Sequence, residues 1–235
     1  VTKARQFSRP LSGTFLDFGC KFGHLTPLVT ALGAEHVIAV DVDTEHVEQG
    51  RRFFGPRFDV EFMLSDECYI DVPTASVDFV LVNEVISHIN PAFLETFYAE
   101  VTRVMRPGAE IVVADGNNLA HGPTQMDLID WYSSWDGGES KEFGTRNYES
   151  VRATLIARAF PALDAASLAR IAANTAGLWG DRLLAVVRRF VEEGRLTERP
   201  HRLGVSPVNP VHGVVMERGF YPAEVELALR RYGVE

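Results

Sequence analysis

The stretch "FLDFGCKFGH" at residues 15–24 decides the fold, because it joins an apolar run to a helical pattern through a glycine-containing turn. "HLTPLVTALG" at 24–33 follows with apolar residues at helical spacing. Gly19 and Gly23 permit backbone angles that other residues rarely adopt. Lys21 stands where a cofactor-binding turn of this shape often carries a middle glycine. The stretch therefore predicts a cofactor-binding turn with one unusual member.

Outward from this turn, strands and helices alternate along the first half of the chain. Further strands are predicted at 36–43, 60–64, 77–82 and 110–115, and helices at 24–33, 44–54, 91–108 and 222–233. We expect Thr44 to cap the second of these helices and Pro107-Gly108 to end the third. Apolar strands separated by helices are typical of a parallel sheet that is covered on both faces. The fold class is therefore α/β, with a doubly wound, mostly parallel sheet.

The alternation stops after the fifth strand. Helical patterns occur at 147–160, 164–177 and 181–194, and a loop rich in Pro and Gly covers 198–213. We predict a core domain at 1–118, a mainly helical cap inserted at 119–215 over the carboxyl edge of the sheet, and a return to the core at 216–235.

The composition is that of an ordinary soluble globular protein, with 46% hydrophobic and 23% charged residues among 235. A net charge of −9 argues against nucleic acid as a partner, because a phosphate backbone needs a basic face. No apolar stretch is long enough to span a bilayer, so we expect no membrane contact, and the two cysteines favour a reduced, cytoplasmic setting. Cys20 and Cys68 lack metal-ligand spacing, and we expect no metal site. A homodimer is left open.

Polar residues and glycines follow the predicted strands where each strand ends. In doubly wound sheets the ligand sits outside the carboxyl ends of the strands. This rule selects the following positions: 17–23, 41–43, 65–67, 83–84 and 115–118. Their clustering at one edge is the main functional signal in the sequence.

Five of these segments together resemble a known family. "FLDFGCKFGHLTPLV", "VIAVDVD", "FMLSDE", "ASVDFVLVNEVISHI" and "VTRVMRPGAEIVVAD" are similar, in order and spacing, to the motifs of class I S-adenosylmethionine-dependent methyltransferases. The resemblance covers residues 14–115. It implies a Rossmann-like fold, S-adenosylmethionine as the cofactor and S-adenosylhomocysteine as its product.

The resemblance also implies roles for single residues. Asp17 would lie near the ammonium of the methionine moiety, and Asp41 would accept the ribose hydroxyls, with Asp43 as the second choice. Asp66 would accept the adenine amino group beside the amide of Glu67, and Asn83 would lie near the methionine end. The remaining predicted cofactor contacts are Gly19, Cys20, Lys21, Gly23, Val42 and Ser65.

Two points in the turn bear on the cofactor. NAD is the alternative, since an acid like Asp41 also suits the ribose of NAD, but position 24 lacks the last glycine of G-x-G-x-x-G. Lys21 departs from the glycine that the family usually has. Its ammonium either pairs with the cofactor carboxylate or points into water, and we favour the second.

Catalytic and substrate residues are predicted next to this site. His88 is the candidate base for a hydroxyl acceptor and Glu84 is the second, although backbone bonding by His88 and a structural role for Glu84 are equal alternatives. In the insertion we expect the acceptor to meet residues of the following set: His121, Trp131, Trp135 and His212. Trp131 and Trp135 at helical spacing also fit a packing role, and solvated loop positions are the default for the histidines.

The sequence thus predicts a methyltransferase acting on a hydroxyl or amine of a small molecule, such as a sugar or secondary metabolite. A non-catalytic S-adenosylmethionine-binding protein and a NAD-dependent oxidoreductase are the alternatives. Members of the family normally continue with two more strands after the last helix, where this sequence reads "RRYGVE". Either the sequence continues beyond residue 235 or these strands are missing.

Overall fold

The structure is a computed structural model that describes residues 6–120, 124–132, 134–137, 147–200 and 205–234. The chain divides into two units. Val1–Gly116 together with Tyr221–Glu235 form the first, here called the α/β unit, and Asn117–Phe220 form the second, here called the helical unit.

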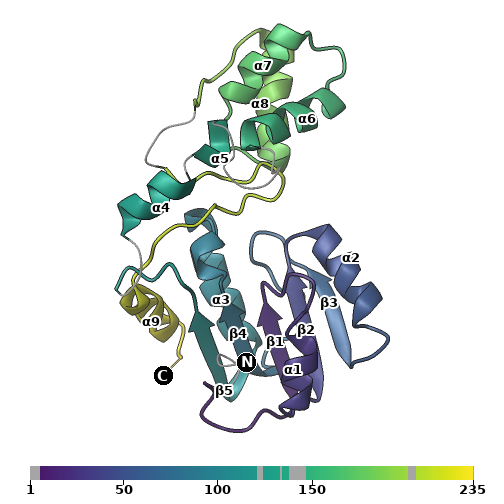
Figure 1. Cartoon of the computed structure of the whole chain (residues 1–235), viewed down its shortest axis with the longest axis vertical. Helices are drawn as coiled ribbons and strands as arrows, with labels where there is room; N and C mark the ends of the chain where they lie inside the picture. The colour runs from purple at the N-terminus through teal and green to yellow at the C-terminus, as the bar shows by residue number, and fades with distance from the viewer. Residues whose placement is uncertain (1–5, 121–123, 133, 138–146, 201–204, 235) are drawn as a thin grey trace. The chain divides into compact units, whose positions relative to one another are not determined.

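The α/β unit is built on a five-stranded sheet in the order β3-β2-β1-β4-β5 (Figure 1). All four neighbouring strand pairs are parallel. The strands are β1 (Thr14–Phe18), β2 (His36–Asp41), β3 (Val60–Leu64), β4 (Val77–Asn83) and β5 (Met105–Ala114). This confirms the predicted doubly wound parallel sheet.

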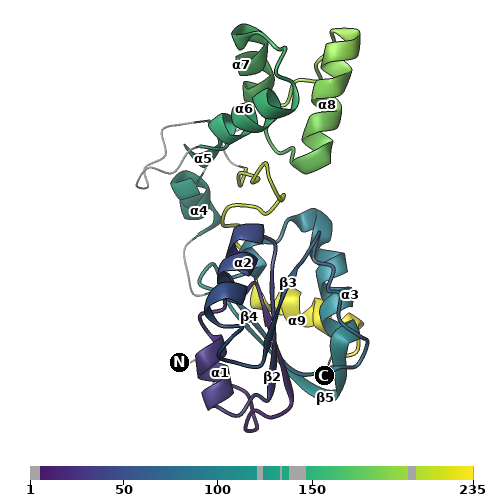
Figure 2. The ribbon, with the colours of Figure 1, turned by 90° about the vertical axis from the view of Figure 1, so that its right-hand side faces the viewer.

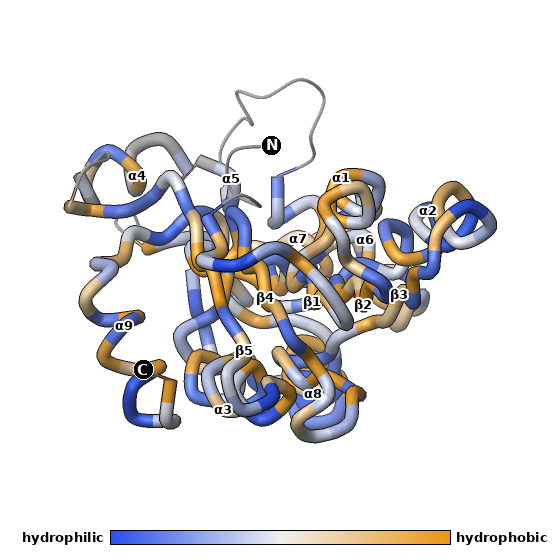
Figure 3. The backbone as a smooth tube through the Cα atoms, turned by 90° about the horizontal axis from the view of Figure 1, so that it is seen from below, coloured by the Kyte–Doolittle hydropathy of each residue, from blue (hydrophilic) through white to orange (hydrophobic). Residues whose placement is uncertain are grey.

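Helices cover both faces of this sheet. Figure 3 shows α1 (Thr26–Ala31) and α2 (Thr44–Phe53) on one face and α3 (Leu94–Val104) on the other. The helix α9 (Pro222–Arg231) packs against α3. Tyr232, the residue after α9, donates a 2.7 Å hydrogen bond from its hydroxyl to Glu95 of α3. Under α1, the core contains Phe15, Phe79 and Leu81, each fully buried. Burial on both faces explains why the strands are almost continuously apolar.

The N-terminal cap of α2 differs from the prediction. Asp43, not Thr44, is the capping residue: its backbone is extended and its carboxylate accepts the amide protons of Glu45 at 2.8 Å and His46 at 3.3 Å. Thr44 is the first helical residue. A carboxylate at this position satisfies two free amides and also favours the positive end of the helix dipole.

The boundary between α3 and β5 also differs from the prediction. The helix ends at Val104, and β5 begins at Met105, so Pro107 and Gly108 lie in the strand and do not end the helix. The register between β4 and β5 shifts between Val77 and Phe79. Proline and glycine fit there because β5 is the outer strand of the described sheet, where a missing ladder hydrogen bond is tolerated.

The helical unit has its own apolar core. Its helices are α4 (Gln125–Tyr132), α5 (Ser134–Gly137), α6 (Tyr148–Ala159), α7 (Ala165–Ala173) and α8 (Gly180–Glu193). Helix α6 contacts both α7 and α8 (Figures 1 and 2), and they enclose Ile156, Ile171, Leu183 and Val187. The patterns predicted α6–α8, whereas α4 and α5 were not predicted. A cap position over the sheet edge stays a prediction.

Within the described ranges, no helix has the length and apolar composition that crossing a bilayer requires.

Candidate functional site

The turn after β1 is fixed by the strand beside it. The amides of Gly19 and Cys20 both donate to the Val40 carbonyl, at 2.8 and 2.9 Å. Gly19 has φ +76°, and a Cβ there would lie 2.2 Å from a methyl carbon of Val85. Gly23 has φ +79°, and a Cβ there would lie 2.5 Å from the ring of Phe62. Both glycines are therefore needed for the turn conformation and for close packing.

Cys20 contributes to this turn as a core residue. Its thiol is buried with Ala39, Val47 and Phe62, and burial raises the pKa of the thiol well above its ordinary value. This confirms the expected packing role for the side chain. Both backbone groups of Cys20 are also bonded, because its amide donates to the Val40 carbonyl and its carbonyl accepts the Gly23 amide at 2.9 Å.

Lys21 acts through its backbone. Its φ is +55°, in the left-handed region that favours glycine, and its amide donates a 2.7 Å hydrogen bond to Oδ2 of Asp41. The exposed side chain runs toward Phe22, with the ammonium 5.9 Å from the ring centroid. The unusual lysine therefore keeps the conformation that a glycine would supply.

Asp41 is held by groups on both sides of its carboxylate. Besides Lys21, the Asp43 amide donates to its Oδ1 at 3.0 Å, and Nδ1 of His46 lies 3.3 Å from the same oxygen. A carboxylate offers about four acceptor positions, so these contacts leave room for one further donor. Two ribose hydroxyls would fit if His46 turned away. His46 was not predicted from the sequence. Its position in the first turn of α2, five residues after Asp41, is the feature that could have indicated it.

Asp17 is the most unusual group at the strand ends. Its side chain is 2% exposed, and its Oδ2 has no hydrogen-bond partner among the described residues. Burial, and secondly the negative charge of Asp41, raise the pKa of Asp17 to about 7. A buried carboxylate with a missing partner is costly, and a cation bound there would offset the cost.

Two more buried oxygens lack a partner after the neighbouring strand. Asn83 ends β4, and its Oδ1 is buried and unbonded within the described part of the chain. Ser87, 1% exposed, donates its amide to Asp115 at 3.0 Å, while its Oγ is likewise buried and unbonded. Because β1 pairs with β4, Asp17 and Asn83 lie at the same edge of the sheet. Ser87 was missed by the sequence reasoning, since one serine in "NEVISHI" carries no distinctive pattern.

The two predicted catalytic residues occupy the same loop. Glu84 has φ +56°, and its Oε2 accepts the Gly116 amide at 2.8 Å, so this side chain ties the loop after β4 to the one after β5. His88 is the last residue of a short 3-10 helix, Ile86–His88, and its amide donates to the Val85 carbonyl at 2.8 Å. The His88 side chain is half-buried. The Glu84 bond is the structural hydrogen bond that was foreseen as the alternative for that residue, whereas the His88 bond is made by its backbone amide, so the role of its imidazole stays a prediction.

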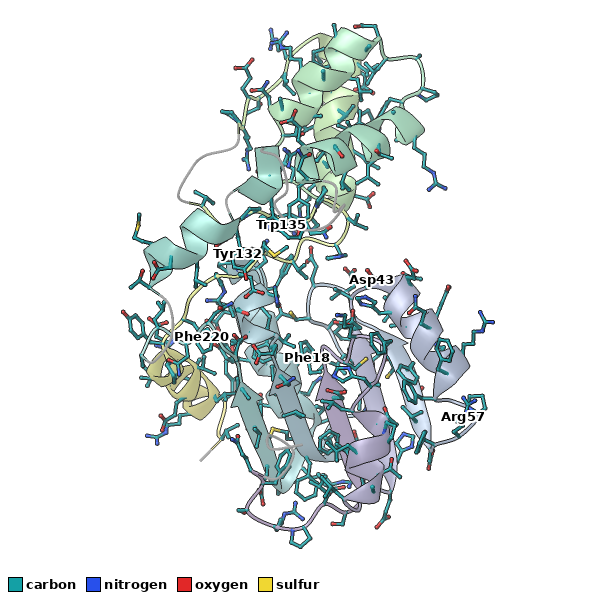
Figure 4. The ribbon with its side chains drawn as sticks, in the orientation of Figure 1. Phe18, Asp43, Arg57, Tyr132, Trp135 and Phe220 are labelled. Atoms are coloured by element: carbon teal, nitrogen blue, oxygen red, sulfur yellow. The ribbon has the colours of Figure 1, made fainter. Side chains whose placement is uncertain are left out.

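The segment after β3 forms a tight turn. The Ser65 amide donates to the Asp41 carbonyl at 2.8 Å, and the Ser65 hydroxyl donates to the Tyr69 carbonyl at 2.9 Å. Glu67 and Cys68 have φ values of +46° and +69°. Asp66 is exposed, which leaves its carboxylate accessible to a ligand beside Asp41. Figure 4 shows the neighbouring landmarks, Phe18 at the end of β1 and Asp43 at the start of α2.

The predicted substrate residues fall in the helical unit. Trp135 is buried, with its ring centroid 6.3 Å from that of Tyr148, so it packs inside this unit (Figure 4). His212 is half-buried, and Trp131 lies on α4. His121 lies outside the described residues. Among the residues that the structure describes, no group of three or more His, Cys, Asp or Glu side chains could hold a metal ion.

Comparison with known proteins finds a family model that matches part of the chain. Residues 15–108 match the family model described as "Methyltransferase domain". The chain is 26% identical over 133 residues to 2-methyl-6-phytyl-1,4-hydroquinone methyltransferase of Synechocystis, covering 53% of this chain and 41% of that protein. It is 34% identical over 121 residues to ribosomal protein L11 methyltransferase of Paraburkholderia phytofirmans, covering 51% and 36%. The matched part thus spans about two fifths of these relatives.

A solved structure resembles almost the whole chain. An S-adenosylmethionine-dependent methyltransferase from Mesorhizobium loti aligns with a TM-score of 0.50 and 16% identity, over 98% of this chain and 78% of that one. At this identity the likeness shows the fold alone. Residues 15–108 of this chain are thus similar to a methyltransferase domain, and the parallel sheet agrees with the fold of the Mesorhizobium loti structure.

Proposed function

We propose that this protein transfers a methyl group from S-adenosylmethionine to a hydroxyl or amine of a small molecule. The observation that carries the proposal is the buried carboxylate of Asp17. One of its oxygens lacks a partner in the described part of the chain, and it lies in the central strand, at the edge where Asp41 and Asn83 end the two neighbouring strands. A ligand with a cationic group and a diol would complete these acceptors.

The residues at this edge fit the cofactor. Asp17 would hold its ammonium, Asp41 its ribose, Asp66 its adenine amino group and Asn83 the methionine end. The turn residues Gly19, Cys20, Lys21 and Gly23, together with Val42, Ser65 and the Glu67 amide, would line the remaining contacts. S-adenosylmethionine supplies an electrophilic methyl group on a sulfonium sulfur.

Catalysis in this proposal rests on positioning and on one base. Holding an acceptor in line with the methyl group supplies much of the rate, because the bimolecular encounter is already organised. His88 would accept the proton of an acceptor hydroxyl at an imidazole nitrogen. Glu84 is the weaker candidate because its Oε2 already accepts the Gly116 amide.

A small acceptor is the substrate class that we propose. The net charge of −9 disfavours a nucleic-acid substrate. One relative is named for a hydroquinone and another for a ribosomal protein, so relatives of this domain differ in acceptor. The helical unit would select the acceptor, with Trp131, His121 and His212 as candidate contacts. Trp135 is better explained as a packing residue.

Thermal unfolding with two ligands tests the cofactor. A ligand at 100 times its Kd stabilises the folded state by about 2.7 kcal/mol. We expect S-adenosylhomocysteine to raise the melting temperature and NAD to leave it unchanged. Stabilisation by NAD alone would overturn the proposal.

Turnover is tested by incubating the chain with S-adenosylmethionine and a panel of small alcohols, phenols and amines, and by measuring S-adenosylhomocysteine release. His88→Gln should lower turnover of a hydroxyl acceptor without changing the affinity for S-adenosylhomocysteine. Cofactor binding without turnover of any acceptor would favour the non-catalytic alternative.

A further inference from the structure

The helical unit contains a pocket of about 350 Å³, and all of its described lining residues belong to this unit. It is lined by Asp136 of α5, by Ala176 and Gly177 between α7 and α8, and by Arg199, Pro200 and 205–208 of the returning chain. Its volume lies within the range of small-molecule sites. A Cβ on Gly177 would meet no described residue within 4 Å.

The walls of this pocket are fixed by backbone hydrogen bonds. The Arg199 amide donates to the Asn174 carbonyl at 2.7 Å, and the Ala176 amide donates to the Arg199 carbonyl at 2.9 Å. The exposed Arg199 side chain therefore starts from a fixed point on the rim. A pocket whose backbone is already ordered costs less entropy to fill.

Of the two ionisable groups in the described lining of the pocket, Asp136 is offset by Arg152, which leaves the positive charge of Arg199 unbalanced. Asp136 is 3% exposed and is ion-paired with the fully buried Arg152. The Arg152 Nε also donates to the Ala172 carbonyl at 2.8 Å, whereas its Nη2 is buried without a partner among the described residues. The nearby Glu198 is paired with Arg170 at 3.2 Å, so it does not neutralise Arg199.

The other residues that line the pocket are mostly apolar. Ala176, Pro200, Val205, Pro207 and Val208 present apolar surface, and Ser206 offers a hydroxyl. We propose that this pocket binds a small carboxylic acid with a short apolar body, held by the Arg199 guanidinium. Arg199 and the carboxylate would form a charge-assisted, two-point contact while the apolar body lies against the prolines and valines.

Ligand-observed NMR titrations of the full chain test the proposal with three probes: hexanoate, hexylamine and inorganic phosphate. We expect hexanoate to bind, and hexylamine, which has the same body but the opposite charge, not to bind. Binding of hexylamine as tight as that of hexanoate would overturn the assignment, and so would binding of phosphate without binding of hexanoate. Absence of hexanoate binding at millimolar concentration also overturns it.

Substitutions of Arg199 test whether hexanoate binds in this pocket. Arg199→Gln should weaken hexanoate binding by about tenfold because the charge-assisted contact is lost, and Arg199→Lys should keep part of it. Arg158→Gln, at an exposed arginine of α6, is the matched control and should have no effect. Equal binding by Arg199→Gln and the unaltered protein contradicts the proposal. Binding of S-adenosylhomocysteine, measured in parallel, should be the same in all variants, so this test and that of the proposed function fail independently.

Discussion

The backbone amide of Lys21 donates a 2.7 Å hydrogen bond to Oδ2 of Asp41, and this bond joins the turn after β1 to the end of β2. Lys21 makes it from a left-handed backbone conformation, with φ +55°. The residue that interrupts the glycine pattern is thus the one that orients the acid predicted to hold the ribose.

Replacement of Lys21 separates its backbone from its ammonium. Lys21→Gly should raise the free energy of unfolding by about 1 kcal/mol, because a left-handed conformation is costly for residues with a Cβ. Lys21→Ala keeps the backbone cost and removes the ammonium. Its affinity for S-adenosylhomocysteine should therefore stay within about twofold of that of the unaltered protein, well below the tenfold change that corresponds to about 1.4 kcal/mol. Calorimetric titration and urea unfolding measure the two effects. A tenfold loss of affinity in Lys21→Ala would show that the ammonium reaches the ligand.

Removal of the Asp41 carboxylate should weaken cofactor binding strongly. Hydrogen bonds to charged groups contribute about 1.5–3 kcal/mol each, so Asp41→Asn should lower the affinity for S-adenosylhomocysteine by at least tenfold. Asp59→Asn is the matched control, because Asp59 is an exposed acid paired with His36 in the segment before β3. Equal affinities of the two variants contradict a ribose contact by Asp41.

His46→Ala tests whether His46 competes for Asp41. Its imidazole occupies an acceptor position on Oδ1 at 3.3 Å. If the ribose needs that position, the variant should bind S-adenosylhomocysteine more tightly than the unaltered protein does. Weaker binding would instead assign His46 to holding the carboxylate in place. Calorimetric titration distinguishes the two outcomes.

Stability should depend on pH through Asp17. Its pKa is about 7 in the folded protein, against 3.8 for an ordinary aspartate. Between these values the folded state holds a proton that the unfolded chain has released, so the free energy of unfolding falls as the pH rises. Three pKa units set an upper limit of about 4 kcal/mol. Asp17→Asn should therefore be more stable than the unaltered protein at pH 8, and this advantage should disappear below pH 3.8. Urea unfolding at several pH values measures it, and a constant difference between the two proteins contradicts it.

The buried ion pair of the helical unit offers a test of stability. Asp136→Ala leaves the guanidinium of Arg152 buried without its counter-charge, and breaking such a pair costs about 3–5 kcal/mol. Adding Arg152→Met should recover most of this loss, because no unpaired charge then remains. Urea unfolding of both variants gives the comparison. Additive effects of the two substitutions would contradict a coupled pair.

The parallel sheet and the edge that carries the polar residues followed from the sequence alone, whereas the order of the strands in the sheet came from the structure. Apolar runs broken by helical periods permit few arrangements other than a parallel sheet, and the carboxyl ends of its strands must then meet at one edge. This reasoning gave all five strands and placed Asp17, Asp41 and Asn83 together. It gave the helix cap one residue too late and extended the helix before β5, since capping and strand starts depend on a single backbone angle.

The tertiary structure alone decided how each of these residues is bonded. The support of Asp41 by Lys21, the bond between Glu84 and Gly116 and the buried pair of Asp136 and Arg152 are contacts between segments separated in sequence. The missing partner of Asp17 among the described residues likewise depends on what other segments place beside it. A local pattern shows which face of a strand or helix is apolar. It carries no information about which atom on another segment will meet a given carboxylate, because that depends on the packing of the whole unit.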